Sequence, residues 1–178
     1  SDGAYFPASS AMMVWRVTPH FCASASWVIS PRSKRQRRIS LLMGVPVIGY
    51  KTDEFPAFYS RESGLNVSAR LDSPAEIAEY AKAHWNLGMR SAILVTNPVP
   101  EAEAISQVEM EPIIAKASAE AIKQGIHGQK LTPFLLGRIS ELTEGKSLRS
   151  NLALLLNNAS LAAQIAGEMA TKKKVWAI

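Results

Sequence analysis

Two short apolar runs with a capped helix between them constrain the fold of this chain more than any other feature of its sequence. Val45 to Tyr50 and Ser91 to Thr96 are rich in β-branched residues, as buried strands are. Between them, Ser73-Pro74-Ala75-Glu76 is a capping box with proline at the first helical position, and Gly88 ends the helix. This order of elements predicts a parallel α/β fold, part of an α/β/α layered sheet with helices. A ligand crevice is then expected beyond Thr96.

The segments after Thr96 carry the start and stop signals of three more helices. In the first of them, a proline six residues after the capping serine would remove a helical hydrogen bond. In chain order, the further elements expected are a weaker strand at Asn66 to Leu71, a helix capped by Ser106 and either kinked at Pro112 or begun at Glu111, a helix opened by Thr132-Pro133 and closed near Gly145, and a helix from Leu148 to about Ala170 that Ser147 can cap.

The last of these helices is apolar on two sides. At about 100° per residue, seven of its apolar side chains share one face, while Leu154 and Leu161 fall nearly opposite. The seven are Leu148, Leu152, Leu155, Leu156, Ala159, Ala162 and Ala166. We therefore expect the helix to be covered on both sides over its middle turns.

The net charge of +5 lies entirely in the first quarter of the chain. Residues 1–43 hold six basic residues against the one acid Asp2, whereas residues 44–178 hold 14 residues of each sign. No carboxylate occurs between Asp2 and Asp53, and this stretch shows no sustained period of 2 or 3.6 residues. We therefore place a boundary near Gly44. Residues 1–43 are expected to be a divergent basic segment, poorly ordered or artefactual, 44–170 to be the folded domain, and 171–178 to be a basic tail.

Charge and residue types exclude several classes of function. The neutral domain has no basic face for a phosphate backbone, so no nucleic acid is expected as a partner. The single cysteine, Cys22, cannot form an internal disulfide, and no Cys or His pair has metal-ligand spacing. No apolar stretch reaches the roughly 20 residues of a membrane span. We expect a cytoplasmic protein with no membrane partner.

Four stretches of the later part of the chain resemble one enzyme family in order and spacing. The longest runs from Gly44 to Ser60, with the sequence GVPVIGYKTDEFPAFYS. The others are Asn97-Pro98-Val99-Pro100, Glu109-Met110-Glu111-Pro112, and Thr132-Pro133-Phe134-Leu135-Leu136 leading to Asn157-Asn158-Ala159. The chain thus resembles the pseudouridine-5'-phosphate glycosidases, also called the indigoidine synthase A family. The resemblance covers residues 44–170, the later part of a normal member.

This resemblance implies a small-molecule nucleotide substrate and reversible cleavage of its C-glycosidic bond, giving uracil and ribose 5-phosphate. A C–C bond has no basic leaving oxygen to protonate, so it resists the two-carboxylate route of ordinary glycosidases. Family members are understood to form a Schiff base between the opened ribose and a lysine. A manganese ion held through an aspartate, a second aspartate and a glutamate handle the proton transfers. The resemblance also implies the fold of the family's C-terminal half and a homotrimer.

The residues of this chemistry belong to the family's N-terminal half, and they are not found at their motif positions in this sequence. The lysine of a Gly-x-Lys segment would fall near Val28, and Met12 stands where an aspartate of a Ser-Ala-Asp-Leu stretch belongs. Methionine and valine neither donate protons nor form imines. We expect residues 1–43 to arise from a mis-spliced, frame-shifted or truncated gene model, with a degenerate paralogue as the alternative.

Four residues are candidates for a site. Asn157 and Asn158 match an asparagine pair that in the family is thought to contact the ribose or the base, and they are predicted as catalytic residues. Two buried amides in a helix need partners, although Asn157 can also belong to a solvated stripe. Asn97 and Thr132 are predicted to bind substrate, and their plainer roles are a turn and a helix cap. No residue is predicted to bind a metal.

Three functions of different classes remain open. The first is membership of the C-glycosidase family, inactive as this chain. The second is a non-catalytic oligomerising domain or degenerate paralogue. The third is a small basic nucleic-acid binder, against which the neutral body of the domain argues.

Overall fold

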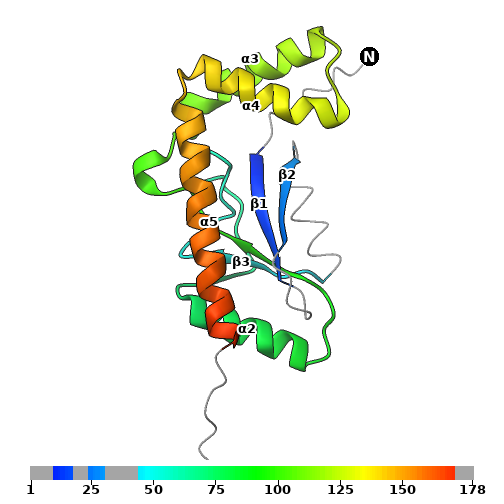
Figure 1. Cartoon of the computed structure of the whole chain (residues 1–178), viewed down its shortest axis with the longest axis vertical. Coiled ribbons are helices and arrows are strands. Elements are labelled where there is room, and N and C mark those ends of the chain that lie inside the picture. The colour runs from blue at the N-terminus through cyan, green and yellow to red at the C-terminus, as the bar shows by residue number, and fades with distance from the viewer. Residues whose placement is uncertain (1–9, 18–23, 31–43, 171–178) are drawn as a thin grey trace, which may run out of the picture.

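A computed structural model describes residues 10–17, 24–30 and 44–170 of the chain (Figure 1). The described residues form a small sheet and several helices. The mixed α/β class predicted from the sequence is confirmed. The elements are β1 (Ser10–Val17), β2 (Ser24–Ser30), β3 (Val47–Tyr50), β4 (Ala69–Leu71), α2 (Pro74–Asn86), β5 (Ile93–Thr96), η1 (Glu101–Glu103), α3 (Gln107–Lys123), η2 (Gly128–Lys130), α4 (Leu131–Leu142) and α5 (Lys146–Ala170).

The strands form one sheet in the order β2-β1-β5-β3-β4. Strand β3 is parallel to both of its neighbours, and Ile48 lies opposite Val95 of β5 and Ala69 of β4. The predicted strand-helix-strand unit and the weaker strand are therefore confirmed. Strand β1 is antiparallel to both β5 and β2. These two strands were not predicted, because their residues show no sustained alternation.

The expected boundary near Gly44 stays a prediction. Five of the six basic residues of the first quarter, at 32–38, and the basic tail at 171–178 lie outside the described residues.

Helix α2 begins and ends as its sequence predicts. The Ser73 hydroxyl accepts a hydrogen bond from the Glu76 amide (3.2 Å), and the Glu76 carboxylate accepts one from the Ser73 amide (2.9 Å). Gly88 follows the helix with φ of +80°, a conformation that glycine adopts without steric cost. The capping box thus fixes where α2 begins, and Gly88 fixes where it ends.

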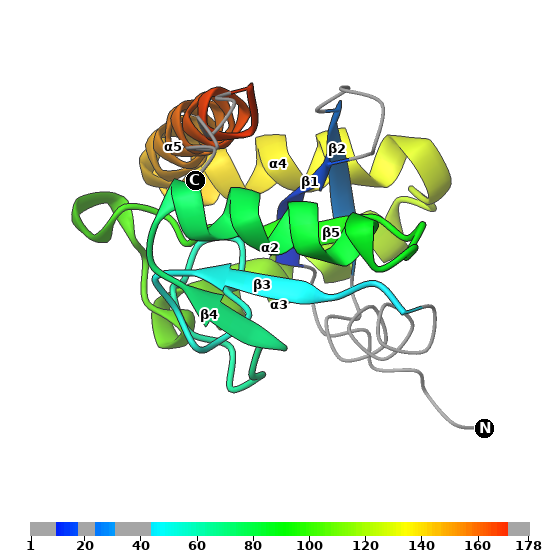
Figure 2. The ribbon, with the colours of Figure 1, turned by 90° about the horizontal axis from the view of Figure 1, so that it is seen from below.

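One face of the sheet packs against α2 and the C-terminal half of α5 (Figures 1 and 2). The buried residues of this sheet core are Ile48, Ile77, Ala81, Ile93, Val95, Leu161 and Ile165. The alternate residues Val47 and Leu94 point to the other face, where Phe55 from the irregular segment 51–68 covers them. Period-2 alternation therefore sends neighbouring residues of β3 and β5 into two different apolar clusters.

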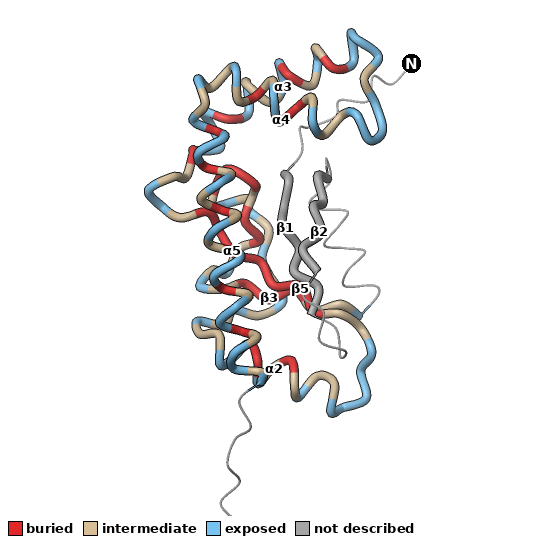
Figure 3. The backbone as a smooth tube through the Cα atoms, in the orientation of Figure 1, coloured by how far each residue is buried: buried red, intermediate tan, exposed pale blue. Residues whose placement is uncertain are grey.

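A second large core lies between α3, α4 and the first turns of α5, away from the sheet (Figure 3). It contains the ring pair Phe58 and Tyr59, whose centroids are 4.5 Å apart in an edge-to-face arrangement. The other buried members of this helical core are Val99, Ile105, Met110, Ala117, Ala121, Leu135, Ile139 and Leu154.

Three expected helix starts need correction. Helix α3 begins at Gln107 with Pro112 inside it, so a start at Glu111 is wrong. The N-cap of α4 is Lys130, without a side-chain cap bond, so Thr132 is not a helix cap. Ser147 does not cap α5 either, because it lies inside the helix and its amide donates to the Thr143 hydroxyl (3.1 Å).

The faces of α5 also differ from the expectation. The buried face carries Leu154 and Leu161, the residues predicted to lie opposite the main apolar face. Leu148, Leu152 and Leu156, from the predicted main face, are 50%, 51% and 73% exposed. The expectation that both sides are covered is therefore wrong for this structure, because the described elements pack against one side only.

Gly49 provides a test of how β3 leaves the sheet. A Cβ added there would overlap the Thr52 carbonyl oxygen, because the chain folds back through Lys51, which has φ of 55°. We expect Gly49→Ala to lower the free energy of unfolding by about 2 kcal/mol or more. The matched control is Gly137→Ala on α4, where nothing lies within 4 Å of an added Cβ. Helix propensity should make it stabilising by about 0.5–1 kcal/mol. Urea denaturation of both variants measures the difference, and equal effects would contradict this account of the turn.

Tyr59 makes the stability of the helical core depend on pH. Burial raises its pKa from 10.0 to about 12, and a hydrogen bond with Ser147 opposes that rise. As the pH rises, Tyr59 loses its proton first in the unfolded chain. Its contribution to the free energy of unfolding is therefore full below pH 10 and is lost as the pH rises toward 12. We expect Tyr59→Phe to remove this part of the pH dependence. Urea denaturation across that pH range measures it, and a variant with an unchanged slope would exclude Tyr59 as the cause.

Candidate functional site

The carboxyl ends of β3 and β5 meet at one edge of the sheet because the two strands are parallel. The Thr96 hydroxyl donates to the Ile48 carbonyl (3.2 Å) and ties the strands together near this edge. Beyond Thr96 the chain stays buried through Asn97, Pro98 and Val99. This is the place where open α/β sheets bind ligands, and it is where the sequence predicted a crevice.

Asparagine side chains from α5 meet the chain at this edge. The Asn97 Nδ2 donates to the Asn158 Oδ1 over 3.0 Å, although the two residues are 61 positions apart. Asn97 is 8% exposed and Asn158 is 2% exposed. The half-buried Asn157 donates from its Nδ2 to the Pro98 carbonyl (3.2 Å). The structure thus brings together three of the four predicted site residues.

Two carbonyl oxygens of the buried segment after β5 accept side-chain hydrogen bonds from outside the sheet. Pro98 and Pro100 have no N–H to donate. Asn157 donates to the Pro98 oxygen, and the Arg61 guanidinium donates to the Val99 oxygen (2.8 Å). Arg61 was not predicted, because a single arginine after the motif ending at Ser60 carries no periodic or spacing signal.

Thr132, the fourth predicted residue, lies apart from the amides. It is in the first turn of α4, which packs against α3 and the start of α5. Within the described ranges, no hydrogen bond joins it to Asn97, Asn157 or Asn158. A role in substrate binding stays a prediction for this residue.

Two further oxygens on α5 lie near the amides in sequence. The Ser150 Oγ and the Asn151 Oδ1 are buried, and neither has a hydrogen-bond partner among the described residues. Ser150 is seven residues before Asn157, about two helical turns, and so lies on the same side of the helix. The sequence could have indicated this polar stripe, since Ser150, Asn157 and Asn158 all fall on the side of Leu154.

The acidic residues after β3 are engaged in holding their own loop. The Glu54 carboxylate accepts hydrogen bonds from the amides of Ser63 (3.0 Å) and Gly64 (2.9 Å), and these bonds lower its pKa. Asp53 forms an ion pair with Arg70 (2.8 Å). Both carboxylates therefore act as structural acceptors in this conformation.

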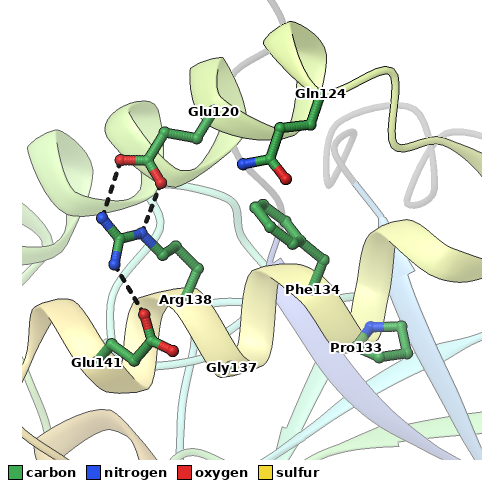
Figure 4. Close-up of a pocket in the computed structure, with 7 residues that line it drawn as sticks. All are labelled: Glu120, Gln124, Pro133, Phe134, Gly137, Arg138 and Glu141. Atoms are coloured by element: carbon green, nitrogen blue, oxygen red, sulfur yellow. Dashed lines mark hydrogen bonds and ion pairs between the residues drawn. The ribbon is translucent and has the colours of Figure 1, made fainter.

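A separate surface hollow of about 510 Å³ lies between α3 and α4 (Figure 4). Arg138 bonds to Glu120 across the two helices and to Glu141 on its own helix (2.7 Å). The guanidinium lowers the pKa of Glu120, and the two carboxylates raise the pKa of Arg138. The hollow is lined by Glu120, Gln124, Pro133, Phe134, Gly137, Arg138 and Glu141. Its charges are paired with one another, so it is not a second candidate site.

The chemistry of the amide cluster is orientation and hydrogen bonding. An asparagine amide has two donor hydrogens and an acceptor oxygen, but it does not exchange protons near neutral pH. In the part of the chain that the structure describes, no three His, Cys, Asp or Glu side chains gather to hold a metal ion. The manganese ion that the resemblance implies stays a prediction. None of the described helices is long and apolar enough to cross a membrane.

A double-mutant cycle tests the amide pair. We expect Asn97→Leu or Asn158→Leu alone to cost about 1–3 kcal/mol, because each leaves a buried amide without its partner. The double variant should cost clearly less than the sum of the two, since it removes both polar groups. Asn157→Leu is the control, because it breaks a bond at the half-buried edge and leaves the pair intact. Urea denaturation provides the energies, and additive costs for Asn97 and Asn158 would contradict the bond.

Known proteins match the same part of the chain that carries these residues. A family model described as "Indigoidine synthase A like protein" matches residues 41–168. A pseudouridine-5'-phosphate glycosidase from Lysinibacillus sphaericus (strain C3-41) is 54% identical over 123 residues, covering 69% of this chain and 40% of that protein. One from Paracoccus denitrificans (strain Pd 1222) is 52% identical over 129 residues, covering 72% and 42%.

Two solved structures share the fold. An indigoidine synthase A-like protein from Thermotoga maritima aligns with a TM-score of 0.64 at 35% identity, covering 72% of this chain and 42% of that one. The prealnumycin C-glycosynthase AlnA, solved in complex with ribulose 5-phosphate, aligns with a TM-score of 0.68 at 30% identity, covering 80% and 46%. The chain thus spans less than half the length of these relatives. Over the domain that holds its asparagine cluster, this chain belongs to the indigoidine synthase A family, the family of the pseudouridine-5'-phosphate glycosidases.

Proposed function

We propose that this chain carries the amide part of a site for reversible C-glycosidic cleavage of pseudouridine 5'-phosphate to uracil and ribose 5-phosphate. One observation carries the proposal. Two stretches that resemble the family, at Asn97 and at Asn157-Asn158, come together in direct hydrogen bonds at the carboxyl edge of the sheet. That edge is the usual ligand side of such a fold.

Amide side chains suit this substrate. Uracil presents N–H donors and carbonyl acceptors in one plane, and ribose presents hydroxyl groups, so an amide can both donate to and accept from either. The names of the relatives support a pseudouridine 5'-phosphate substrate. The complex of AlnA with ribulose 5-phosphate supports a sugar phosphate as a ligand of this fold.

The proposed roles follow from how each amide is held. The bond from Asn97 fixes the rotamer of Asn158, so the Asn158 amide group has a set direction without reorganisation on binding. The bond to the Pro98 carbonyl holds Asn157 in the same way at the half-buried edge. Arg61 steadies the Val99 carbonyl and with it the loop that carries Asn97. These groups bind and orient, and we assign them no proton transfer.

The residues for bond cleavage itself are not among those described. The resemblance requires a Schiff-base lysine and a manganese-binding aspartate, and this sequence has neither at the matching motif positions. Lys51 is the lysine nearest to β3, but it is exposed and its Nζ lies 5.1 Å from the centroid of the Tyr50 ring. A Schiff-base lysine needs a pocket that shields it from water, and the exposed Lys51 has no such pocket. The proposal includes action in the cytoplasm.

A second candidate is a non-catalytic domain that acts by self-association. The observation that favours it is the exposed apolar face of α5, with Leu148, Leu152 and Leu156. Large exposed apolar surfaces of this kind mark protein contacts. This candidate needs no catalytic residue.

We expect the purified chain not to release uracil from pseudouridine 5'-phosphate, with or without added manganese, because it lacks the lysine and the metal-binding aspartate. Chromatographic measurement of uracil tests this, with a complete family glycosidase as the positive control.

Borohydride reduction with ribose 5-phosphate adds a second readout. An imine would appear as a mass increase on one lysine. We expect none at stoichiometric level on Lys34, the one lysine of residues 1–43, or on Lys51. A stoichiometric adduct together with uracil release above the blank would show that the chain is a working enzyme. The position of the catalytic lysine in this sequence would then have been assigned wrongly.

A further inference from the structure

Two neighbouring residues of α5 carry buried oxygens that the described part of the fold does not satisfy. The Ser150 Oγ and the Asn151 Oδ1 are the only buried side-chain N or O atoms among the described residues without a hydrogen-bond partner. A helical serine often donates to the carbonyl four residues before it, and Ser150 does not. Folded proteins satisfy the great majority of such atoms. Two of them on adjacent residues are therefore a feature that packing alone does not explain.

The turns of α5 on either side show how the fold treats its other polar groups. One turn earlier, the Thr143 Oγ1 donates to the Ser147 Oγ (2.9 Å), and Ser147 is also hydrogen-bonded to Tyr59. Two turns later, Asn157 and Asn158 have partners in the segment after β5. The unsatisfied oxygens are thus confined to one turn between two satisfied ones.

Helical geometry sets this turn in line with the asparagine pair. Helix α5 runs along the molecule from α4 to α2 (Figure 1). Ser150 is seven residues before Asn157, and Asn151 is seven residues before Asn158. Seven residues are nearly two full turns, so the four polar side chains share one side of the helix over about 10 Å. This length is comparable with the extent of a single nucleotide, so one ligand can reach both pairs.

We infer that Ser150 and Asn151 bind the sugar of the substrate while the asparagine pair binds its uracil, an assignment that rests on the proposed C-glycosidic substrate. The Asn151 Oδ1 only accepts hydrogen bonds, so its partner must carry a hydrogen to donate, which a fully ionised phosphate group lacks. Ribose hydroxyls both donate and accept, and they therefore match an amide oxygen and a serine hydroxyl together. The planar amides instead match the N–H and C=O groups of uracil, which lie in one plane. Asn151 is half-buried, so its side of the helix is open to solvent in part.

Separate titration of the two halves of the substrate tests this assignment. Ribose 5-phosphate or uracil is added to the full chain, and NMR chemical-shift changes give the dissociation constant of each. We expect Asn151→Leu to weaken ribose 5-phosphate binding by about tenfold and to leave uracil binding within about twofold, because it removes a hydrogen bond to the sugar alone. Asn157→Leu should show the opposite pattern. Ser160→Ala is the control, because Ser160 is an exposed serine on the same helix.

Stability separates a binding role from a structural one. Ser150→Ala and Asn151→Leu each remove a buried oxygen that has no partner among the described residues, so we expect both variants to unfold at a higher urea concentration than the wild type. Ser150→Ala should also weaken ribose 5-phosphate binding. Loss of a structural contact lowers the urea midpoint instead, as expected for Asn158→Leu.

Weaker ribose 5-phosphate binding in the two stabilised variants, with uracil binding kept, supports the inference. Unchanged ribose 5-phosphate binding, or an equal loss of both ligands, overturns it and leaves the proposed function standing. A lower urea midpoint in both variants also overturns it, because the two oxygens then serve the fold. A wild type that binds neither ligand overturns the proposed function and the inference together.

Discussion

The hydrogen bond between Asn97 and Asn158 lies where the two large cores of the domain meet, and it joins two of the segments that cross between the cores. The chain leaves the sheet core at Val95 and enters the helical core at Val99, with Asn97 between them. Helix α5 makes the same transition in reverse, from Leu154 in the helical core to Leu161 in the sheet core, with Asn158 between them. Both crossings therefore place an amide at the same level, where each amide supplies the partner that the other needs when buried.

Local signals in the sequence were sufficient to predict the strands and the helix around this junction. The capping box at Ser73 and the β-branched runs ending at Tyr50 and Thr96 act within a few residues, so the parallel unit and its carboxyl edge could be predicted. The asparagines were proposed as site residues because their stretches resemble the family, since local signals alone left a turn for Asn97 and a solvated stripe for Asn157 as the plainer roles. Their mutual bond could not be predicted, because it joins residues 61 positions apart and depends on how α5 lies across the sheet.

Features set by packing were missed or reversed. Helix α5 has leucines on two sides, and composition alone gave no reason to prefer Leu154 and Leu161 as the buried side over Leu148 and Leu152. The buried side with Leu154 also carries Ser147, Ser150 and Asn158, so the polarity of the two sides did not predict which of them packs inside the fold. Strands β1 and β2 were missed because their residues show no sustained alternation and because the pairing of β1 with β5 is a long-range contact with no local signal.

The choice of amides at this junction also supports the proposed site. Replacing both members of a buried hydrogen-bonded pair with apolar groups of similar shape is often nearly neutral for stability, so folding alone does not require amides between two apolar cores. Leucines at positions 97 and 158 would join the cores directly. Amides instead keep donors and acceptors in fixed directions at the edge where the sheet opens, and their mutual bond uses only part of their capacity. The donors and acceptors that this bond leaves unused lie in a nearly dry environment, and they support a site that recognises a polar planar ligand. Proton transfer would then fall to other residues, because amides do not exchange protons near neutral pH.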